Sequence, residues 1–525
     1  MGPSTATFAL RGGDRSGAVA ALNALGFQID ATRSVRSTLL DTFDGRLHRA
    51  GLRLELRESD GYELVLGGAD VVAVHLRVPF PPRFADDLPV GPLRDRLSTI
   101  VGVRAVQPQV QIDALMTALS LRDSTDKTIV TATRYDHLVL VGRDVDGVPT
   151  ETLEVHGVIG FRKPLRRTID ALERLGLHRL HGDTLTTVAD IAGVELAGWL
   201  DSPTVPLDPA MPAIAGFREV LANLANTIDM NWQGTIDQLD PEFLHDLRIA
   251  VRRTRAVVGQ GKTVLPPDIV TETREGFARL GALTAPARDL DVYLIEWNGY
   301  VRPLGADAMV ALAPVHAILE QRLAVAHATL EAGLKSTAAS ELMTTWHDRL
   351  DSLDRLGTIE PASPAGHELG GPHAQRPLEL VVAKRITAAH ARLVERGRLI
   401  QPSTPASHVH DLRKDAKKLR YLIECFGSIL PSAPRKKFVS RLKALQNNLG
   451  EHQDAEVHLA MIREIAGQLH ARGVSADTML AIGQLSERLE RVRIAARAEF
   501  VEQFAAYDTP RTQRALDVTL DPLEQ

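Results

Sequence analysis

Basic residues recur at helical spacing in two short segments of this chain, and their side chains could hold an anion. Residues 245–255 read HDLRIAVRRTR, and residues 410–420 read HDLRKDAKKLR. At 3.6 residues per turn, the histidine and three of the basic residues fall on one stripe of each expected helix. Arginine forks and lysine ammonium groups bind phosphates or carboxylates through charge-assisted hydrogen bonds. The first stripe contains His245, Arg248, Arg252 and Arg255, widened by Arg253, and the second contains His410, Arg413, Lys417 and Arg420, widened by Lys414 and Lys418.

Both segments carry more positive than negative charge. The first has four arginines against one aspartate, and the second has five lysines and arginines against two aspartates. Like charges along one helix face repel one another, so a compensating anion is needed. Acidic residues of neighbouring helices could supply it, in which case the stripes are structural, or a long polyanion could. The surplus of cations favours the polyanion. Candidate acidic partners are Asp289, Asp291, Asp454 and Glu456.

The two segments belong to an internal repeat. Residues 288–294 (RDLDVYL) match residues 453–459 (QDAEVHL) at the same offset of 165 that relates the two HDLR segments, without a gap. Two anchors in one register indicate a duplicated unit. Gln453 stands where the first unit has Arg288, so the two halves need not contribute equally. The second unit has a further basic stretch, with Arg435, Lys436, Lys437, Arg441 and Lys443.

The chain changes character near residue 200. Before it, short runs with alternating apolar residues predict antiparallel strands at 51–57, 62–66, 128–133 and 137–141, with turns at 59–61 and 144–147 and helices at 17–25 and 165–175. Four prolines in 202–212 predict a stiff linker. From 213 onward, apolar residues at three- and four-residue spacing predict long helices, interrupted by a loop at 360–376. Two helix starts are expected, with Asp240 or Thr404 as N-cap and Pro241 or Pro405 following it.

Composition places the chain among globular proteins. It has 525 residues, 44% hydrophobic and 24% charged, a net charge of −5 and one cysteine, Cys425. One cysteine excludes a disulfide framework, and no apolar run is long enough to span a bilayer. The negative net charge argues against a uniformly basic nucleic-acid binder. We expect a cytoplasmic protein without a membrane partner.

The HDLR segments with their paired basic residues, followed by RD-x-DV, resemble the CHAD family (conserved histidine α-helical domain). The resemblance covers about residues 213–510 and includes both repeats. It implies two antiparallel four-helix bundles related by a pseudo-two-fold axis, which bind inorganic polyphosphate along a basic channel between the halves. The binding residues that it implies are His245, Arg248, Arg252, Arg253, Arg255, His410, Arg413, Lys414, Lys417, Lys418 and Arg420. From the sequence itself we further expect Arg441 and Lys443 to contribute to binding, with Asp289, Asp291, Asp454 and Tyr421 in support. If the protein binds polyphosphate, we expect it to be associated with polyphosphate granules.

The first 190 residues resemble the CYTH family of triphosphate-tunnel enzymes, through residues 41–47 (DTFDGRL), 50–52 (AGL) and 153–155 (LEV). That family has an antiparallel β-barrel around a tunnel, where basic side chains hold triphosphate and carboxylates help to bind a divalent metal. This chain departs from the pattern. Only Arg57 remains of an expected run of arginines, Val65 replaces a lysine, and His156 follows Glu154 where a second glutamate is expected. One carboxylate cannot hold a metal, so we expect an inactive, structural or regulatory barrel without a cofactor.

The expected fold class is therefore α+β. A CYTH-like antiparallel β-barrel domain (1–195) and a linker (196–212) precede an all-α domain (213–515) of two pseudo-symmetric bundles, with repeats at about 213–350 and 378–515. The expected function is polyphosphate binding through duplicated HDLR-x3-[RK][RK]-x-R helices.

Several alternatives stay open. The N-terminal domain could be an active triphosphatase that uses Mg²⁺ or Mn²⁺, or the helical half could be a scaffold with purely structural charge clusters. A metal site built from His245, His410, Asp289 and Asp454 lacks HxxxH or HExxH spacing. Non-specific contact with other polyanions such as nucleic acid remains open, although an aromatic content of 4% argues against base stacking.

Overall fold

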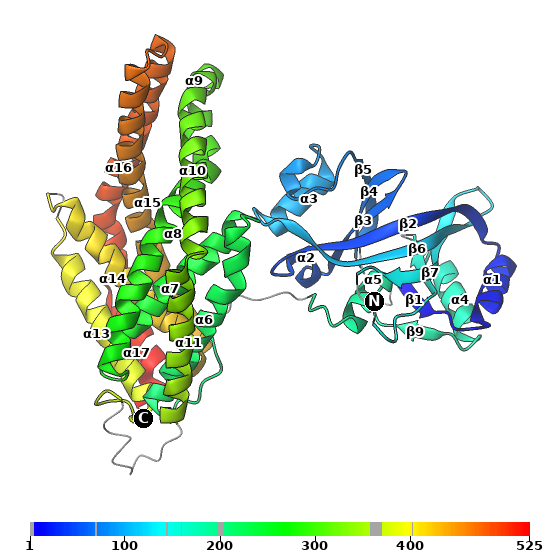
Figure 1. Ribbon diagram of the computed structural model, residues 1–525, viewed down its shortest axis with the longest axis horizontal. Coiled ribbons are helices and arrows are strands. Elements are labelled where there is room, and N and C mark those ends of the chain that lie inside the picture. The colour runs from blue at the N-terminus through cyan, green and yellow to red at the C-terminus, as the bar shows by residue number, and fades with distance from the viewer. Residues whose placement is uncertain are drawn as a thin grey trace. The chain divides into compact units, whose positions relative to one another are not determined.

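The computed structural model describes residues 5–68, 71–142, 145–158, 160–196, 204–357, 370–401 and 403–524. The chain divides into two units, Met1–Asp201 and Ser202–Gln525. The first unit contains a sheet with flanking helices, and the second consists of long helices (Figure 1). The expected α+β class is therefore confirmed. Among the helices of the described ranges, none has the length and apolarity needed to cross a bilayer.

The N-terminal unit is built on one antiparallel sheet of nine strands. Their order is β5-β4-β3-β2-β6-β7-β8-β1-β9, so β5 and β9 stand at the two ends. The strands are β1 (Thr5–Ala9), β2 (Gln28–Thr42), β3 (Leu52–Ser59), β4 (Gly61–Gly68), β5 (Val71–Val78), β6 (Val106–Arg122), β7 (Thr128–Leu140), β8 (Thr152–Gly157) and β9 (His178–Leu180).

This sheet is strongly curled. Arg53 Nη1 on β3 lies 3.9 Å from Glu154 Oε2 on β8, although β2, β6 and β7 separate these strands in the sheet. Side chains on the concave face therefore meet across the interior. Apolar side chains of the helices pack against the sheet in three separate cores. The helices are α1 (Asp14–Leu25), α2 (Arg46–Arg49), α3 (Pro92–Val101), α4 (Arg162–Glu173) and α5 (Thr184–Ile191).

Most strands expected from alternation are present, with one difference. The runs 128–133 and 137–141 belong to the single strand β7. The register against β6 shifts between Asp113 and Leu115, and His137 has a φ of 54°. This irregularity is a bulge, which changes the apolar alternation within one strand. The expected turn at 144–147 falls partly outside the described residues.

The helical unit contains eleven described α-helices. In the first repeat they are α6 (Ala213–Ile236), α7 (Pro241–Gln260), α8 (Pro267–Val301), α9 (Ala306–Ala311), α10 (Ala313–Leu334) and α11 (Thr337–Gly357). In the second repeat they are α13 (Leu378–Arg398), α14 (Ala406–Cys425), α15 (Ser432–Ala471), α16 (Ala476–Tyr507) and α17 (Pro510–Glu524). The helices α13, α14 and α15 each begin 165 residues after α6, α7 and α8, which is the offset of the sequence repeat.

Hydrogen bonds between the repeats show a pseudo-two-fold axis. Ala213 N donates to Arg376 O at 2.8 Å, and Leu378 N donates to Met211 O at 2.9 Å. Each donor and acceptor of the first bond has its counterpart, 165 residues away, in the second bond. Such reciprocal pairing is the signature of an isologous, two-fold contact.

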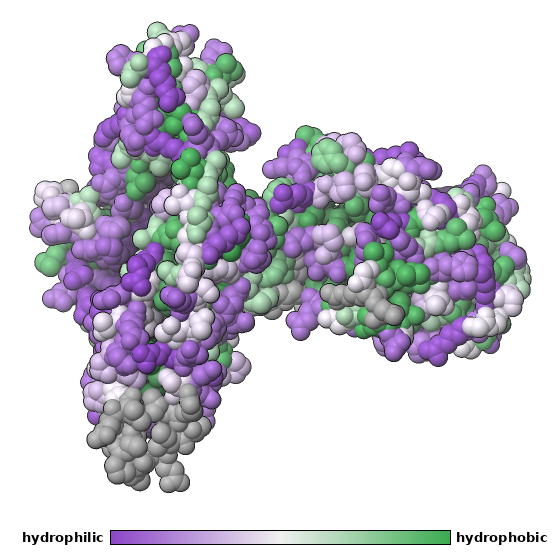
Figure 2. Space-filling view, in the orientation of Figure 1, coloured by the Kyte–Doolittle hydropathy of each residue, from purple (hydrophilic) through white to green (hydrophobic). Residues whose placement is uncertain are grey.

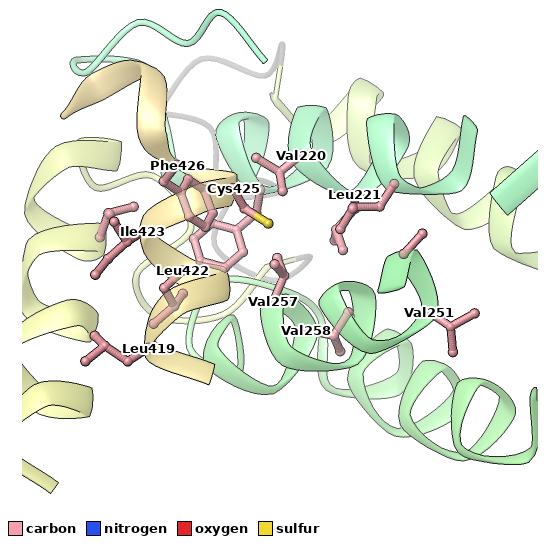
Figure 3. Close-up of a cluster of buried hydrophobic side chains, with 14 of the residues drawn as sticks. Val220, Leu221, Val251, Val257, Val258, Leu419, Leu422, Ile423, Cys425 and Phe426 are labelled. Atoms are coloured by element: carbon pink, nitrogen blue, oxygen red, sulfur yellow. The ribbon is translucent and has the colours of Figure 1, made fainter. Parts of the chain in front are cut away.

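Both hydrophobic cores of this unit draw on both repeats. The larger core joins α6, α7 and α14 through residues such as Leu221, Val251, Val257, Leu419 and Leu422 (Figure 3). The smaller core lies among α8, α9, α10, α15 and α16, which extend together beyond the other helices (Figure 1). Hydrophilic side chains cover most of the outer face of this unit in Figure 2. The repeats are therefore held together by shared apolar burial, the dominant stabilising term in folding.

One of the two expected helix starts is confirmed. Asp240 caps α7 by accepting hydrogen bonds from the backbone N–H groups of Glu242 and Phe243, at 2.9 and 3.3 Å. The expectation for Thr404 is wrong by one residue, because α14 begins at Ala406 after Pro405. The hydroxyl of Thr404 instead accepts a hydrogen bond from Gln401 N. Residues 204–208, which lie within the predicted linker, have no regular secondary structure, and the predicted loop 360–376 is described only from residue 370.

Candidate functional site

The basic stripes of α7 and α14 meet at the contact between the two repeats. α7 packs against α14, and Arg252 lies close enough to its counterpart Lys417 for their charges to repel. Arg248 is likewise close to Arg252, and Lys417 to Arg413 and Arg420. We use the term cation cluster for Arg248, Arg252, Arg253, Arg255, Arg413, Lys417 and Arg420.

In the first repeat, Arg248 joins α7 to α8. Its Nη1 donates to Gly281 O at 3.2 Å and to Thr284 Oγ1 at 3.4 Å, and its Nη2 lies 3.5 Å from Asp289 Oδ1. Arg288 Nη1 donates to Pro241 O at 3.2 Å, and the charge of Arg288 still acts on Arg248 and Asp289.

In the second repeat, Arg413 has the same role between α14 and α15. Its Nη1 donates to Gly450 O at 3.2 Å and to Asp454 Oδ1 at 3.0 Å. His410 Nδ1 lies 2.9 Å from Gln453 Oε1, so the glutamine that replaces Arg288 holds the histidine. Aspartates at equivalent positions thus each pair with one arginine, as the structural reading of the stripes requires.

These two aspartates also face each other across the axis. Burial raises the pKa of Asp289, and the negative charge of Asp454 adds to that effect. The centre of the contact therefore holds two carboxylates, each paired with an arginine of its own repeat. Because each pair is largely neutralised, the remaining cations decide the net charge of the cluster.

A buried tyrosine supports two of the arginines. Arg253 and Arg420 approach the ring of Tyr421, with their guanidinium carbons 6.0 and 5.6 Å from its centroid. Glu424 lies 3.2 Å from Arg253 Nη2 and 3.3 Å from Arg420 Nε. One carboxylate is therefore shared between two arginines from different repeats, with cation–π attraction adding to it.

Three members of the cluster have no acidic partner in the part of the chain that the structure describes. Arg252, Arg255 and Lys417 make no ion pair or hydrogen bond with the described residues. For Arg255, the lack of a partner among these residues is explained by a local difference between the two repeats. Its counterpart Arg420 donates to Gln446 Oε1 at 2.9 Å, but Gly281 stands at the position equivalent to Gln446.

Lys417 shows most clearly how nearby cations and the lack of an acidic partner among the described residues change a pKa in the cluster. It is half-buried, and burial together with the charges of Arg252, Arg413 and Arg420 lowers its pKa to about 7, against the opposing effect of Asp454. Desolvation and neighbouring cations both disfavour an ammonium ion. The cation cluster is therefore a place where positive charges repel one another, as the lowered pKa of Lys417 shows.

The structure places the other expected residues elsewhere. Lys414 pairs with Asp411 at 3.1 Å, and Lys418 pairs with Asp415 at 3.4 Å, both on their own helix. Arg441 donates to Arg511 O on α17 at 2.7 Å. The remaining expected residues are His245, half-buried on α7, Lys443, exposed on α15, and Asp291, which is buried and 3.2 Å from His327 Nε2.

Two contacts of the cluster were missed from the sequence. Glu424 could have been found from its i+4 spacing to Arg420, which is typical of a helical ion pair. Gln446 gives no signal of its own, because its approach to Arg420 depends on how α15 packs against α14.

The alternative of a metal site in the helical unit is not supported. Within the described ranges, no group of three or more histidine, cysteine, aspartate or glutamate side chains is arranged to hold a metal ion. In particular, Asp289 and Asp454 are engaged by Arg248 and Arg413.

The concave side of the N-terminal sheet was the second candidate site. Arg57 Nε donates to Glu55 Oε1 at 2.8 Å, and Arg53 Nη2 lies 3.6 Å from Glu55 Oε2. Arg53 Nη1 also lies 3.1 Å from Asp183 Oδ1, and Glu154 Oε1 accepts a hydrogen bond from Thr184 N at 2.7 Å. Although burial opposes ionisation, Arg57 and Arg53 keep the pKa of Glu55 below its ordinary value. Arg53 was not recognised as an interior residue from the sequence.

This interior does not fit a triphosphate with its divalent metal. Each buried arginine has an internal carboxylate partner, so little positive charge is left for an anion. The carboxylates are likewise held by arginines or by a backbone N–H, so none is available as a ligand. The charges here are compensated within the unit, which contrasts with the cation cluster.

Together, these features define a duplicated helical domain with the cation cluster at its pseudo-two-fold axis. Residues 219–463 match the CHAD domain family model, and this part of the chain is a CHAD domain. A search of curated proteins returned no match.

Three solved structures are similar to parts of the chain. The crystal structure of the CHAD domain from the plant Ricinus communis is 22% identical with a TM-score of 0.43, and covers 60% of this chain and 94% of that one. PptA from Streptomyces chartreusis is 20% identical with a TM-score of 0.41, and covers 56% and 99%. The PH1819 protein from Pyrococcus horikoshii OT3 is 8% identical with a TM-score of 0.24, and covers 36% and 97%.

The compensated interior of the N-terminal unit leads to a stability prediction. Glu55→Gln should destabilise this unit by about 3 kcal/mol or more, because it leaves two buried guanidinium groups without their shared counter-charge. Hydrogen exchange of β3 amides should become faster. Glu58→Gln, an exposed change on the same strand, is the matched control. Equal exchange rates in the two variants would show that the buried pairs do not hold this sheet together.

Proposed function

We propose that the helical unit binds inorganic polyphosphate at the cation cluster. The observation that carries this proposal is the set of three cations, Arg252, Arg255 and Lys417, that lack an acidic partner among the described residues. Phosphate oxygens would supply the missing counter-charge through charge-assisted hydrogen bonds. The affinity should therefore fall steeply as the salt concentration rises.

A phosphate polymer suits the cluster better than a base-paired or base-stacked nucleic acid. The aromatic ring of the cluster, Tyr421, is buried with 4% of its surface exposed, so it cannot stack on a base. The site offers guanidinium and ammonium groups from two helices, which recognise repeated phosphates without reading a sequence. Contact with nucleic acid through its phosphates alone remains the weaker alternative.

The alternative hypothesis, that the charges serve only to link neighbouring helices, accounts for part of the cation cluster. Arg248 with Asp289, and Arg413 with Asp454, link neighbouring helices within each repeat. Partly exposed ion pairs of this kind contribute little to stability, typically 0 to about 1 kcal/mol. They explain why aspartates occupy these positions, but not why Arg252 and Lys417 are placed next to each other.

Removing the two facing cations tests the assignment. Arg252→Gln combined with Lys417→Gln should weaken binding of long-chain polyphosphate by at least about tenfold in a gel shift, because two phosphate contacts are lost. Circular dichroism should remain helical.

The matched control is Lys414→Gln combined with Lys418→Gln. It removes the same charge from cations that already pair with Asp411 and Asp415. If the two double variants bind equally well, the cluster is not the binding site.

The depressed pKa of Lys417 predicts a pH dependence of binding. A polyanion favours the charged ammonium, so the complex binds more protons than the free protein above pH 7. The affinity should therefore fall, by about tenfold between pH 6 and 8.5, the value of one charge-assisted contact.

Lys417→Arg keeps its charge over this range and should lose most of that dependence. Any contribution from His245 and His410 is common to both proteins and cancels in the comparison. Parallel pH profiles for the two proteins would contradict the role of Lys417.

A further inference from the structure

The exposed face of α4 in the N-terminal unit carries a second group of cations. This amphipathic helix buries Leu165, Ile169 and Leu172 in the core under the sheet. Every residue that it leaves fully exposed is charged, and the adjoining Arg174 extends the face. A shallow hollow on this side is lined in part by Lys163, Arg166, Arg167 and Arg174.

Positive charge on this face exceeds negative charge. Arg162, Lys163, Arg166 and Arg167 make no ion pair or hydrogen bond with any residue in the described part of the chain. Of the two acidic residues on the face, Glu173 lies 3.2 Å from Arg179 Nη1 on β9 and is thereby partly neutralised. The carboxylate of Asp170, the other acidic residue, makes no ion pair or hydrogen bond with the described residues.

Some other exposed arginines of the same unit pair with a carboxylate. Arg36 makes a two-pronged contact with Asp113, with both distances 2.8 Å, and Arg122 lies 3.2 Å from Asp126. On α4, by contrast, Arg162 and Arg166, and Lys163 and Arg167, are like charges at i,i+4 spacing. Such pairs destabilise a helix, so an external anion would relieve repulsion here as well.

The chemistry of the face favours a phosphate polymer over a lipid surface. A helix that lies on a membrane inserts apolar side chains beside its cations. The large apolar side chains of α4 are buried under the sheet instead. What remains exposed is a face on which guanidinium and ammonium groups outnumber the carboxylates of Asp170 and Glu173, and its charge is complementary to phosphate groups.

We propose that the exposed face of α4 is a second phosphate-binding surface, and that a long polyphosphate chain engages it together with the cation cluster; this rests on the proposed function of the helical unit. Two linked contacts on one polymer raise the overall affinity, because the second contact forms within a complex that already exists.

The test compares full-length variants of equal charge. Arg166→Gln with Arg167→Gln removes two cations of the face, and Arg77→Gln with Arg96→Gln removes two isolated exposed cations of the same unit. Binding of long-chain polyphosphate is titrated at several salt concentrations. The first variant should bind several-fold more weakly, with a log–log salt slope smaller by about 1.4, because each contact to a single-stranded polyanion contributes roughly 0.7. The second variant should match the wild type.

The outcomes separate this inference from the proposed function. Equal behaviour of the two variants overturns the role of α4 and leaves the cation cluster untouched. If the α4 variant loses polyphosphate binding while the Arg252→Gln/Lys417→Gln variant binds as the wild type does, the α4 surface is supported. The proposal that the cation cluster binds polyphosphate is then wrong. If the α4 variant instead loses binding only to phosphatidylserine vesicles, the surface is a lipid site and the proposal is wrong.

Discussion

Electrostatic repulsion between the two repeats is the constraint on which the site depends. Duplication places Arg252 and Lys417 at equivalent positions, and the pseudo-two-fold axis brings them together, with Arg413 and Arg420 beside them. Apolar packing of α7 against α14 holds these cations in place. In the N-terminal unit, the positive charges of Arg53 and Arg57 are compensated within the unit, because Glu55 lies between them. In the helical unit, by contrast, Arg252, Arg255 and Lys417 have no acidic partner among the described residues.

Much of the fold follows from local patterns in the sequence. The alternation in β4 and the helical spacing around α7 both report which face is buried. The curl of the sheet could not be predicted, because it depends on strand pairings far apart in the chain. It is this curl that brings Arg53 to Glu154. A bulge near His137 also concealed that β7 is one strand, since local irregularity breaks the period of two.

The positions of the cation stripes could be predicted from the sequence, but the acidic partners of the individual cations could not. Arg253 and Lys418 occupy equivalent positions, yet Arg253 reaches Glu424 across the axis while Lys418 bonds Asp415 on its own helix. The counterpart of Glu424 in the first repeat is Gly259, which offers no carboxylate. Duplication predicts which residues correspond. Each residue's contacts depend on neighbours that have since diverged.

The unfolding free energy of Arg252→Met combined with Lys417→Met, measured with and without polyphosphate, tests the central claim most directly. Without ligand, the variant should be more stable than the wild type, because two repelling cations are replaced by side chains of similar length. With polyphosphate, the wild type should gain stability and the variant should gain much less. A variant that is less stable without ligand, and is still stabilised by polyphosphate as strongly as the wild type, would contradict the account.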